Sequence, residues 1–323
     1  MDRRVLLVSL FGGHRALANA QGARRKARVG LLLHGTPATY LLAAAAVREG
    51  LAERGYVEPS TLELVVRYSD GIADRLPALA RELVATQVEV IVTSSTPAIR
   101  AAMAATRTVP IVFFAVADAI GSGLVASLAR PGGNVTGLTL LIPDLGAKHV
   151  ELLAAMIPGL RRITVLRGRG EGAQAFESIA TAVTAHAIEA QFVELGSADD
   201  ISPAFAAMQA SRSQAVIVVD GPLLNNLDAR IAALAAAYRL PMISTLRRYV
   251  DAGSLASYGP DVNAMARRAA THYVDRILSG TRPADLPVEQ PTKFEFVLNL
   301  KTAKSLGLAV PQSVLARADQ LLE

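Results

Sequence analysis

Short runs of Val, Ile and Leu alternate with longer Ala-rich segments of helical period from Val29 onward. This alternation is typical of βα units built around a parallel sheet. Several of the short runs are apolar at every position, so helices are expected to cover both faces of the sheet. We therefore predict an α/β fold with doubly wound parallel sheets. The expected strands are Val29–Leu33, Leu62–Tyr68, Val88–Thr93, Val109–Ala115, Val135–Leu141, Ile163–Leu166, Gln191–Leu195, Ala215–Val219, Met242–Thr245, Ser254–Tyr258 and Phe294–Asn299.

Several of the intervening segments carry helix start and stop signals. Pro97 stands just inside one expected helix and Gly280 just past another, as is usual at helix ends. A further helix is expected over Leu145–Met156, without such punctuation. The punctuated helices are Arg75–Ala85, Pro97–Ala105 and Val262–Leu278, with Asp74, Thr96 and Asp261 as their capping residues.

The chain is too long for one ordinary core. Its 323 residues suit two lobes of roughly 100 to 150 residues each. The turn-rich stretch Arg130–Asn134 cannot extend a helix and separates two blocks of the βα pattern. We expect crossings between the lobes at Thr139–Pro143 and Gly253–Ser257, which together form a hinge. The predicted first lobe is residues 27–139 plus about 256–284, and the second is 140–255 plus 285–323.

The N-terminus has the features of an export signal. The basic pair Arg3–Arg4 precedes the short apolar stretch Val5–Phe11, and Ala18–Ala20 is a small-residue cleavage site of the A-x-A kind. No run in the chain approaches the about 20 apolar residues that span a bilayer. We expect a signal peptide over residues 1–25 and a soluble periplasmic protein. A cytosolic protein with a frayed N-terminus is the alternative.

Composition removes several classes of function. The chain has no cysteine, which excludes a thiolate zinc site, a cysteine nucleophile and a disulfide framework. The formal net charge of +5 comes mainly from scattered arginines without a block of like charges, so nucleic-acid binding is not expected. No G-x-S-x-G elbow, phosphate loop or H-x-x-x-H metal spacing occurs. We therefore expect no enzyme, cofactor, metal or nucleic-acid partner.

Candidate binding residues follow from the expected topology. In open α/β sheets, ligands bind outside the carboxyl ends of the strands, so the polar residues just after each apolar run are informative. The candidates are His34, Ser94, Ser95, Thr96, Asp118, Asp220, Thr245 and Tyr258.

Ser94, Ser95 and Thr96 point to an anion site. Their hydroxyl groups would meet the unpaired N–H groups of the helix that Pro97 opens, and the helix dipole favours negative charge there. A carboxylate fits such a corner. Alternatively, Ser95 and Thr96 only cap the helix.

Asp118 adds a negative charge at the end of the neighbouring strand. A carboxylate there must be paired, solvated or used to bind a cation, because burying it alone is costly. An anion corner beside a carboxylate suggests a zwitterion: an amino acid with its ammonium on Asp118. Asp220 and Tyr258 would then close over the remainder from the second lobe. The alternatives are a turn cap or surface salt bridge for Asp118, and a hydrogen-bonded loop residue for His34.

Several stretches of the sequence resemble a known family. The most specific is the string Leu-Ala-Arg-Pro-Gly-Gly-Asn-Val-Thr-Gly at Leu128–Gly137. On these stretches, which span the chain after residue 25, it resembles the tryptophan-binding-protein-like family of ABC transporter substrate-binding proteins. The others are Gly55–Glu58, Ala73–Pro77, Thr108–Val112, Gly123–Ser127, Lys148 with Glu151–Leu153, Ser257–Pro260 and Val297–Ala303.

The resemblance implies a type I periplasmic-binding fold with three crossings between lobes and hinged closure over a small-molecule ligand. It also implies delivery to an ABC permease and its ATPase, and some members are similar to receptors for aromatic or apolar amino acids. Ser94–Thr96 and Asp118 match the family's hydroxyl-rich loop and acid. However, Ala119 stands where the family usually has Pro, and Ser95 where Gly or Ala is common.

We therefore expect a monomeric solute-binding protein for an amino acid or a related carboxylate. The alternative is a ligand-sensing module of the same fold that signals to a partner protein.

Overall fold

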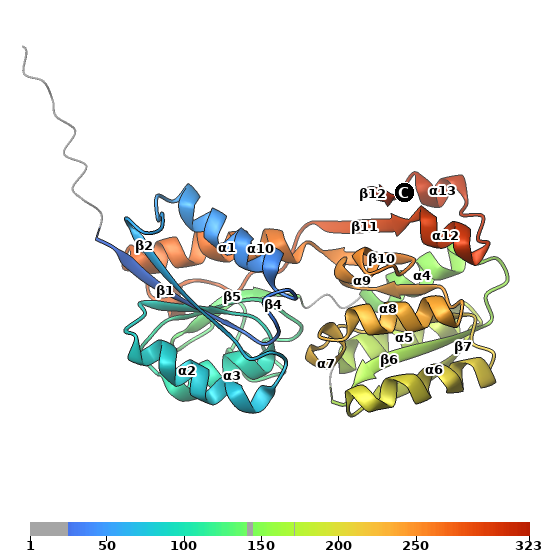
Figure 1. The fold of residues 1–323 in the computed structure, drawn as a ribbon, viewed down its shortest axis with the longest axis horizontal. Helices are drawn as coiled ribbons and strands as arrows, with labels where there is room; N and C mark the ends of the chain where they lie inside the picture. Colours follow the sequence, from blue (N-terminus) through green and yellow to red (C-terminus); the bar gives the residue numbers. More distant parts are fainter. Residues whose placement is uncertain (1–24, 141–144, 171) are drawn as a thin grey trace, which may run out of the picture.

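The computed structural model describes residues 25–140, 145–170 and 172–323. The expected signal peptide, apart from its last residue, and most of the expected first crossing lie outside the described residues. The chain forms two lobes that lie side by side, each with a central sheet and helices on both faces (Figure 1). This arrangement confirms the predicted fold class of two doubly wound α/β lobes.

The first lobe contains a five-stranded parallel sheet in the order β2-β1-β3-β4-β5. Alternate residues of its strands face the two helical layers: Leu31 and Val92 pack under one layer, and Leu32 and Ile91 under the other. The helices α1 and α10 cover one face, and α2 and α3 cover the other. The elements are β1 Ala27–Leu33, α1 Leu41–Glu53, β2 Leu62–Tyr68, α2 Leu76–Ala85, β3 Val90–Thr93, α3 Thr96–Ala105, β4 Ile111–Val116, β5 Val135–Thr139, α10 Val262–Arg268 and α11 Asp275–Leu278.

The second lobe contains a seven-stranded sheet in the order β12-β11-β10-β9-β8-β6-β7. Only the pairing of β10 with β11 is antiparallel among its described ladders. Its core clusters place α4 and α5 on one face and α6 and α8 on the other. The elements are α4 Leu145–Met156, β6 Arg162–Gly168, α5 Ala173–Ala185, β7 Glu189–Leu195, α6 Ile201–Ala210, β8 Ala215–Val218, α7 Pro222–Asn225, α8 Asp228–Ala237, β9 Met242–Ser244, α9 Arg248–Asp251, β10 Ala256–Pro260, β11 Phe294–Asn299, α12 Leu300–Leu306, α13 Gln312–Leu315 and β12 Gln320–Leu322.

The return crossing lies later in the chain than the sequence indicated. The strand β10 pairs in parallel with β9 and antiparallel with β11, so it belongs to the sheet of the second lobe. The chain re-enters the first lobe only after Pro260, and the expected crossing at Gly253–Ser257 is wrong. An apolar run predicts a strand but does not say which of two sheets the strand joins.

The last passage between the lobes also lies later in the chain than the sequence indicated. Residues up to Glu289 pack on the first lobe, because the Glu289 N–H donates to the Gly137 carbonyl at 3.0 Å and Glu289 forms a bridge with Leu138. Residues from Phe294 onward belong to the second sheet. The first lobe therefore includes about 262–289, where the sequence suggested 256–284.

Helix starts agree with the sequence at one of three predicted caps. The Asp261 carboxylate accepts hydrogen bonds from Asn263 N at 2.9 Å and Ala264 N at 3.0 Å, as expected of a capping residue. Asp74 instead lies within a 3₁₀ turn ahead of α2, and Thr96 is the first residue of α3. The segment Ala269–Val274 forms a π-helical turn between α10 and α11.

The specific string Leu128–Gly137 ties three segments of the first lobe together. The Asn134 side chain donates to the Val109 carbonyl at 2.7 Å, and the Thr136 hydroxyl donates to the Leu286 carbonyl at 2.6 Å. Gly137 has φ +150°, and a Cβ at this position would lie 1.9 Å from the Phe113 carbonyl oxygen. Glycine is therefore required for β5 to lie this close to β4. None of the described helices is both long enough and apolar enough to cross a membrane.

Candidate functional site

A cavity of about 530 Å³ lies between the two lobes. Its walls come from the ends of β1, β3 and β4 in the first lobe, and from β8, β9, α4 and α5 in the second. The volume lies within the range of small-molecule binding sites. The cavity lies at the carboxyl ends of parallel strands, where the topology places ligands.

Most of the predicted residues come together around this cavity. Its lining includes His34, Ser94, Ser95, Thr96, Asp118, Asp220 and Thr245.

Tyr258 does not line the cavity. Its ring stacks on Phe294, with ring centroids 5.8 Å apart and 17° between the planes, and lines a separate hollow. Only its backbone is near the site, through a carbonyl that pairs with Nε2 of His149 at 2.8 Å. Because β10 lies within the sheet of the second lobe, successive side chains point to opposite faces, and Tyr258 points away from the cavity. The expectation that Tyr258 closes over the ligand is wrong.

The Ser94–Thr96 corner presents unused donors to the cavity. Ser94 Oγ donates to Tyr40 Oη at 3.1 Å, whereas Ser95 Oγ is enclosed and has no hydrogen-bond partner among the described residues. No side chain caps α3, and no described acceptor takes the N–H of Thr96 or Ala98. The capping alternative therefore does not account for these hydroxyl groups. Unsatisfied donors at the positive end of a helix favour an anion.

Asp118 is half-buried and holds its own turn together. Its Oδ1 accepts from Ile120 N at 3.1 Å and Gly121 N at 2.8 Å. The alternative of a turn cap is thus present in the structure, although Asp118 also lines the cavity. One of its oxygens is already committed to backbone donors.

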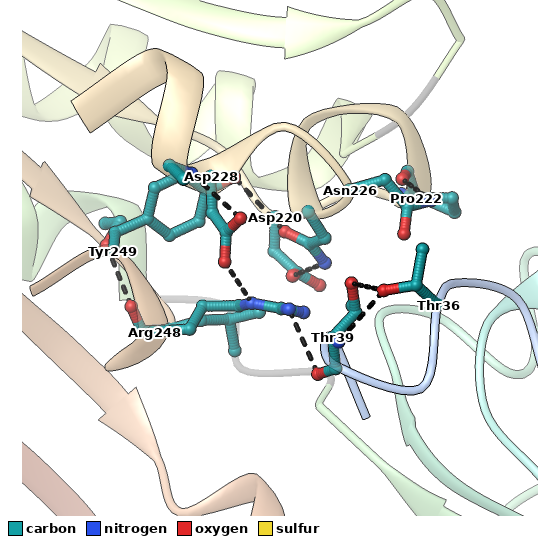
Figure 2. Close-up of polar contacts among 12 residues, drawn as sticks. Thr36, Thr39, Asp220, Pro222, Asn226, Asp228, Arg248 and Tyr249 are labelled. Carbon is teal, nitrogen blue, oxygen red and sulfur yellow. Dashed lines mark hydrogen bonds and ion pairs between the residues drawn. The ribbon is translucent and has the colours of Figure 1, made fainter. Parts of the chain in front are cut away.

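Asp220 lies across the cavity, just after β8 in the second lobe. Its Oδ1 accepts from Asn225 Nδ2 at 2.7 Å, and Arg248 lies close enough to act on it electrostatically. Burial raises the pKa of the Asp220 carboxyl, and the Asn225 bond and the Arg248 charge oppose that rise. Arg248 is itself paired with Asp228, from Nε to Oδ2 at 2.7 Å (Figure 2). Two carboxylates therefore lie near one guanidinium that is paired with only one of them, so this wall favours a cation.

Side chains of the second lobe reach the first lobe beside the cavity. Arg248 Nη2 donates to the Thr39 carbonyl at 3.1 Å (Figure 2). Asn226 Nδ2 donates to the His34 carbonyl at 3.3 Å. The His34 ring pairs with Ser69 Oγ through Nδ1 at 2.8 Å, and burial lowers the pKa of the ring. The His34 side chain is hydrogen-bonded, as its alternative states, and it also lines the cavity, while its backbone joins the lobes.

The comparisons with known proteins agree with this geometry. Residues 36–322 match the family of ABC transporter substrate binding proteins. The chain belongs to this family. The resemblance found in the sequence is thereby confirmed, and so is the expectation that the protein is not an enzyme, because the family consists of substrate-binding proteins.

Individual relatives of this substrate-binding protein have named ligands. The chain is 24% identical to a tyrosine-binding protein of Clostridioides difficile over 263 residues, which are 80% of this chain and 75% of the relative. It is similar to the ABC domain of Streptococcus pneumoniae in complex with L-Trp, with TM-score 0.85, 26% identity and coverage of 92% of this chain and 100% of that one. A conserved domain protein of Vibrio cholerae matches with TM-score 0.85 and 29% identity over the same shares.

Several cavity residues of this substrate-binding protein were missed by the sequence reasoning. They lie within helices or loops and do not directly follow a strand. Asn225, Asn226 and Arg248 lie only a few residues beyond predicted strand ends, so a wider window would have found them. Tyr40 and His149 carry no comparable signal in the sequence. The missed residues are Tyr40, Arg100, His149, Asn225, Asn226 and Arg248.

Proposed function

We propose that this protein is the solute receptor of an ABC importer and that it captures an aromatic amino acid in the interlobe cavity. The observation that carries the proposal is the charge arrangement: an anion corner in the first lobe lies across the cavity from a carboxylate in the second. The named ligands of two relatives, tyrosine and L-Trp, support the aromatic class.

The ligand carboxylate would bind at Ser94–Thr96. Ser95 Oγ and the N–H groups of Thr96 and Ala98 have no described acceptor, and a carboxylate supplies several. Arg100 also lines this part of the cavity and adds positive charge. Charge-assisted hydrogen bonds of this kind are stronger than neutral ones.

The ligand ammonium would bind Asp220 in preference to Asp118. Asp118 already accepts two backbone hydrogen bonds, whereas Asp220 accepts one side-chain bond and is buried at some cost to its charged form. A cation relieves that cost. Tyr40 connects the two subsites, since it bonds to Ser94 and is affected by the charge of Asp220.

This assignment gives a physical reason for closure. One charged group of the ligand binds the first lobe and the other binds the second, so an amino acid favours the state in which the lobes approach. Among the described residues, the hinge would be formed by the passages after Pro260 and after Glu289. The closed, loaded protein would then deliver its ligand to a membrane permease and ATPase from the periplasm.

Calorimetric titration tests the proposal on protein that has been unfolded, dialysed and refolded to remove any bound ligand. L-tryptophan and L-tyrosine should bind with one site per chain. Tryptamine lacks the carboxylate and indole-3-propionate lacks the ammonium, so each should bind about a hundredfold more weakly. Binding of tryptamine or indole-3-propionate as tight as that of tryptophan would contradict the two-ended site, and no binding of any aromatic amino acid would contradict the proposed function.

A further inference from the structure

His149 lines the interlobe cavity, and one of its ring nitrogens has no hydrogen-bond partner among the described residues. The residue lies on α4 and is 3% exposed, and its Nε2 pairs with the Tyr258 carbonyl at 2.8 Å. A carbonyl oxygen can only accept, so Nε2 carries the proton. In the neutral ring, Nδ1 is then an acceptor.

The ring is neutral under ordinary conditions. Burial lowers the pKa of His149 to about 4, and the hydrogen bond to the Tyr258 carbonyl opposes this shift only in part. At neutral pH the Nδ1 lone pair is therefore available. The tautomer is fixed by the protein before any ligand arrives.

Nδ1 of His149 has no hydrogen-bond partner among the described residues. The described side-chain atoms that are enclosed and unpartnered are Ser95 Oγ, Arg167 Nε and Ser254 Oγ. Because Nδ1 of His149 is unpartnered but is not among these enclosed atoms, it is not fully enclosed by the described residues. The interlobe cavity is the described cavity that His149 lines.

The wall around His149 is apolar. The helices α4 and α5 pack closely here, since a Cβ on Gly146 would lie 2.7 Å from Ile179 Cγ1 and 2.8 Å from the Ala175 carbonyl. Leu140 and Leu145 also line the cavity. A ring nitrogen in such a wall suits an aromatic side chain that carries one hydrogen-bond donor.

We infer that His149 Nδ1 accepts a hydrogen bond from the O–H or N–H of the ligand's aromatic side chain and so selects tyrosine or tryptophan over phenylalanine. The inference rests on the proposed function and assigns its side-chain specificity. Phenylalanine fills the same apolar space but leaves Nδ1 buried without a donor, which is unfavourable.

Titration with L-tryptophan, L-tyrosine and L-phenylalanine tests this assignment. The wild-type protein should bind tryptophan or tyrosine at least about tenfold more tightly than phenylalanine, and the better of the two identifies the donor as indole or phenol. In His149→Leu the ratio of these affinities should fall to near one, while phenylalanine binding is retained. His149→Gln keeps a donor for the Tyr258 carbonyl and an acceptor, so it should retain part of the preference.

Lys148→Ala is the matched control on the same helix. Lys148 pairs with Glu151 at 2.7 Å and lines the separate hollow beside Tyr258. Its loss should therefore leave the ratio of tryptophan or tyrosine affinity to phenylalanine affinity unchanged. If His149→Leu does not fold, the ¹⁵N resonance of Nδ1 in the wild-type protein answers the question. It should shift with tryptophan or tyrosine and stay in place with phenylalanine.

Equal affinity of the wild-type protein for all three ligands would overturn the inference, as would a preference that survives in His149→Leu. Both results leave the proposed function intact. Failure of every aromatic amino acid to bind the wild-type protein is a separate result that removes the proposed function and the inference together.

Discussion

At the scale of single residues, two carboxylates in one cavity have different surroundings. Asp118 binds the backbone of its own turn, whereas Asp220 is bonded to Asn225 and desolvation raises its pKa. Hydrogen bonds to backbone N–H groups stabilise the charge of the first, whereas the second gains most from a bound cation. The roles of the two residues should therefore separate on mutation.

We predict that Asp220→Asn weakens tryptophan binding by about a hundredfold, because a ligand ammonium loses its charged partner. Asp118→Asn should weaken binding by less than about tenfold and should lower the stability of its turn instead. Indole-3-propionate, which lacks the ammonium, should bind Asp220→Asn no more weakly than it binds the wild-type protein. Calorimetric titration of both variants with both ligands checks this, and a larger effect at Asp118 would favour that residue as the ammonium partner.

Seven candidate residues could be placed at the cavity from the sequence because parallel strands bring their carboxyl ends together. Tyr258 failed this reasoning, since its ring stacks on Phe294 and lines a separate hollow. His149 could not be found at all. Its importance depends on a carbonyl that is distant in sequence, and no local pattern encodes that contact.

At the scale of elements, the strand β5 depends on its approach to β4. Gly137 is the point of contact, with φ +150° and a would-be Cβ at 1.9 Å from the Phe113 carbonyl oxygen. Neighbouring Gly133 also has positive φ, at +64°, but its Cβ would meet nothing within 4 Å. Substitution of the two glycines therefore distinguishes the cost of a positive φ from the cost of a clash between a Cβ and the neighbouring strand.

We predict that Gly137→Ala lowers the free energy of unfolding by more than about 2 kcal/mol, because alanine must push the two strands apart. Gly133→Ala should cost only about 1 kcal/mol, from the backbone conformation alone. Urea unfolding measures both, provided that the slope with denaturant is unchanged. Equal losses in the two variants would show that contact with Phe113 is not the limiting factor.

Most strands could be predicted from apolar runs, and Asp261 from its position before a helix. The short strand β12 was missed because its three residues, Gln320–Leu322, carry little pattern. The Asp74 and Thr96 caps were wrong because Asp74 lies within a 3₁₀ turn and Thr96 is already the first residue of its helix. The apolar pattern of a strand reflects the burial of all its residues, so it can be seen in the sequence. The first residue of a helix depends on only a few hydrogen bonds and is harder to predict.

At the scale of the whole molecule, Arg248 connects the lobes. It pairs with Asp228 inside the second lobe and donates to the Thr39 carbonyl of the first. Arg247, its neighbour in sequence, contacts Asp251, Glu295 and Gln320, all in the second lobe. The pair provides a matched test of the interlobe contact.

We predict that Arg248→Ala weakens tryptophan binding by about tenfold, because the closed state loses a hydrogen bond to a carbonyl of the other lobe. Removing this positive charge near Asp220 would by itself strengthen binding of an ammonium, so a loss of affinity identifies the contact as the cause. Small-angle scattering should show a larger radius of gyration for ligand-free Arg248→Ala, whereas Arg247→Ala should match the wild-type protein in both measurements. An unchanged radius and affinity in Arg248→Ala would count against this contact as a stabiliser of closure.

Two lobes could be predicted from length and from the break at Arg130–Asn134, but their later boundaries could not. A chain that passes between two similar sheets shows the same βα alternation on either side. The strand β10 pairs with β9 and also with β11, and β11 lies far along the chain. Only tertiary structure assigns these segments to a lobe.

The central claim is that the interlobe cavity holds an aromatic amino acid by both of its charged ends. A crystal structure of the protein with L-tryptophan tests it most directly. The ligand carboxylate should lie at Ser94–Thr96, the ammonium at Asp220 and the indole N–H on His149 Nδ1. Tryptophan bound outside the cavity, or with its carboxylate turned toward the second lobe, would contradict the two-ended site.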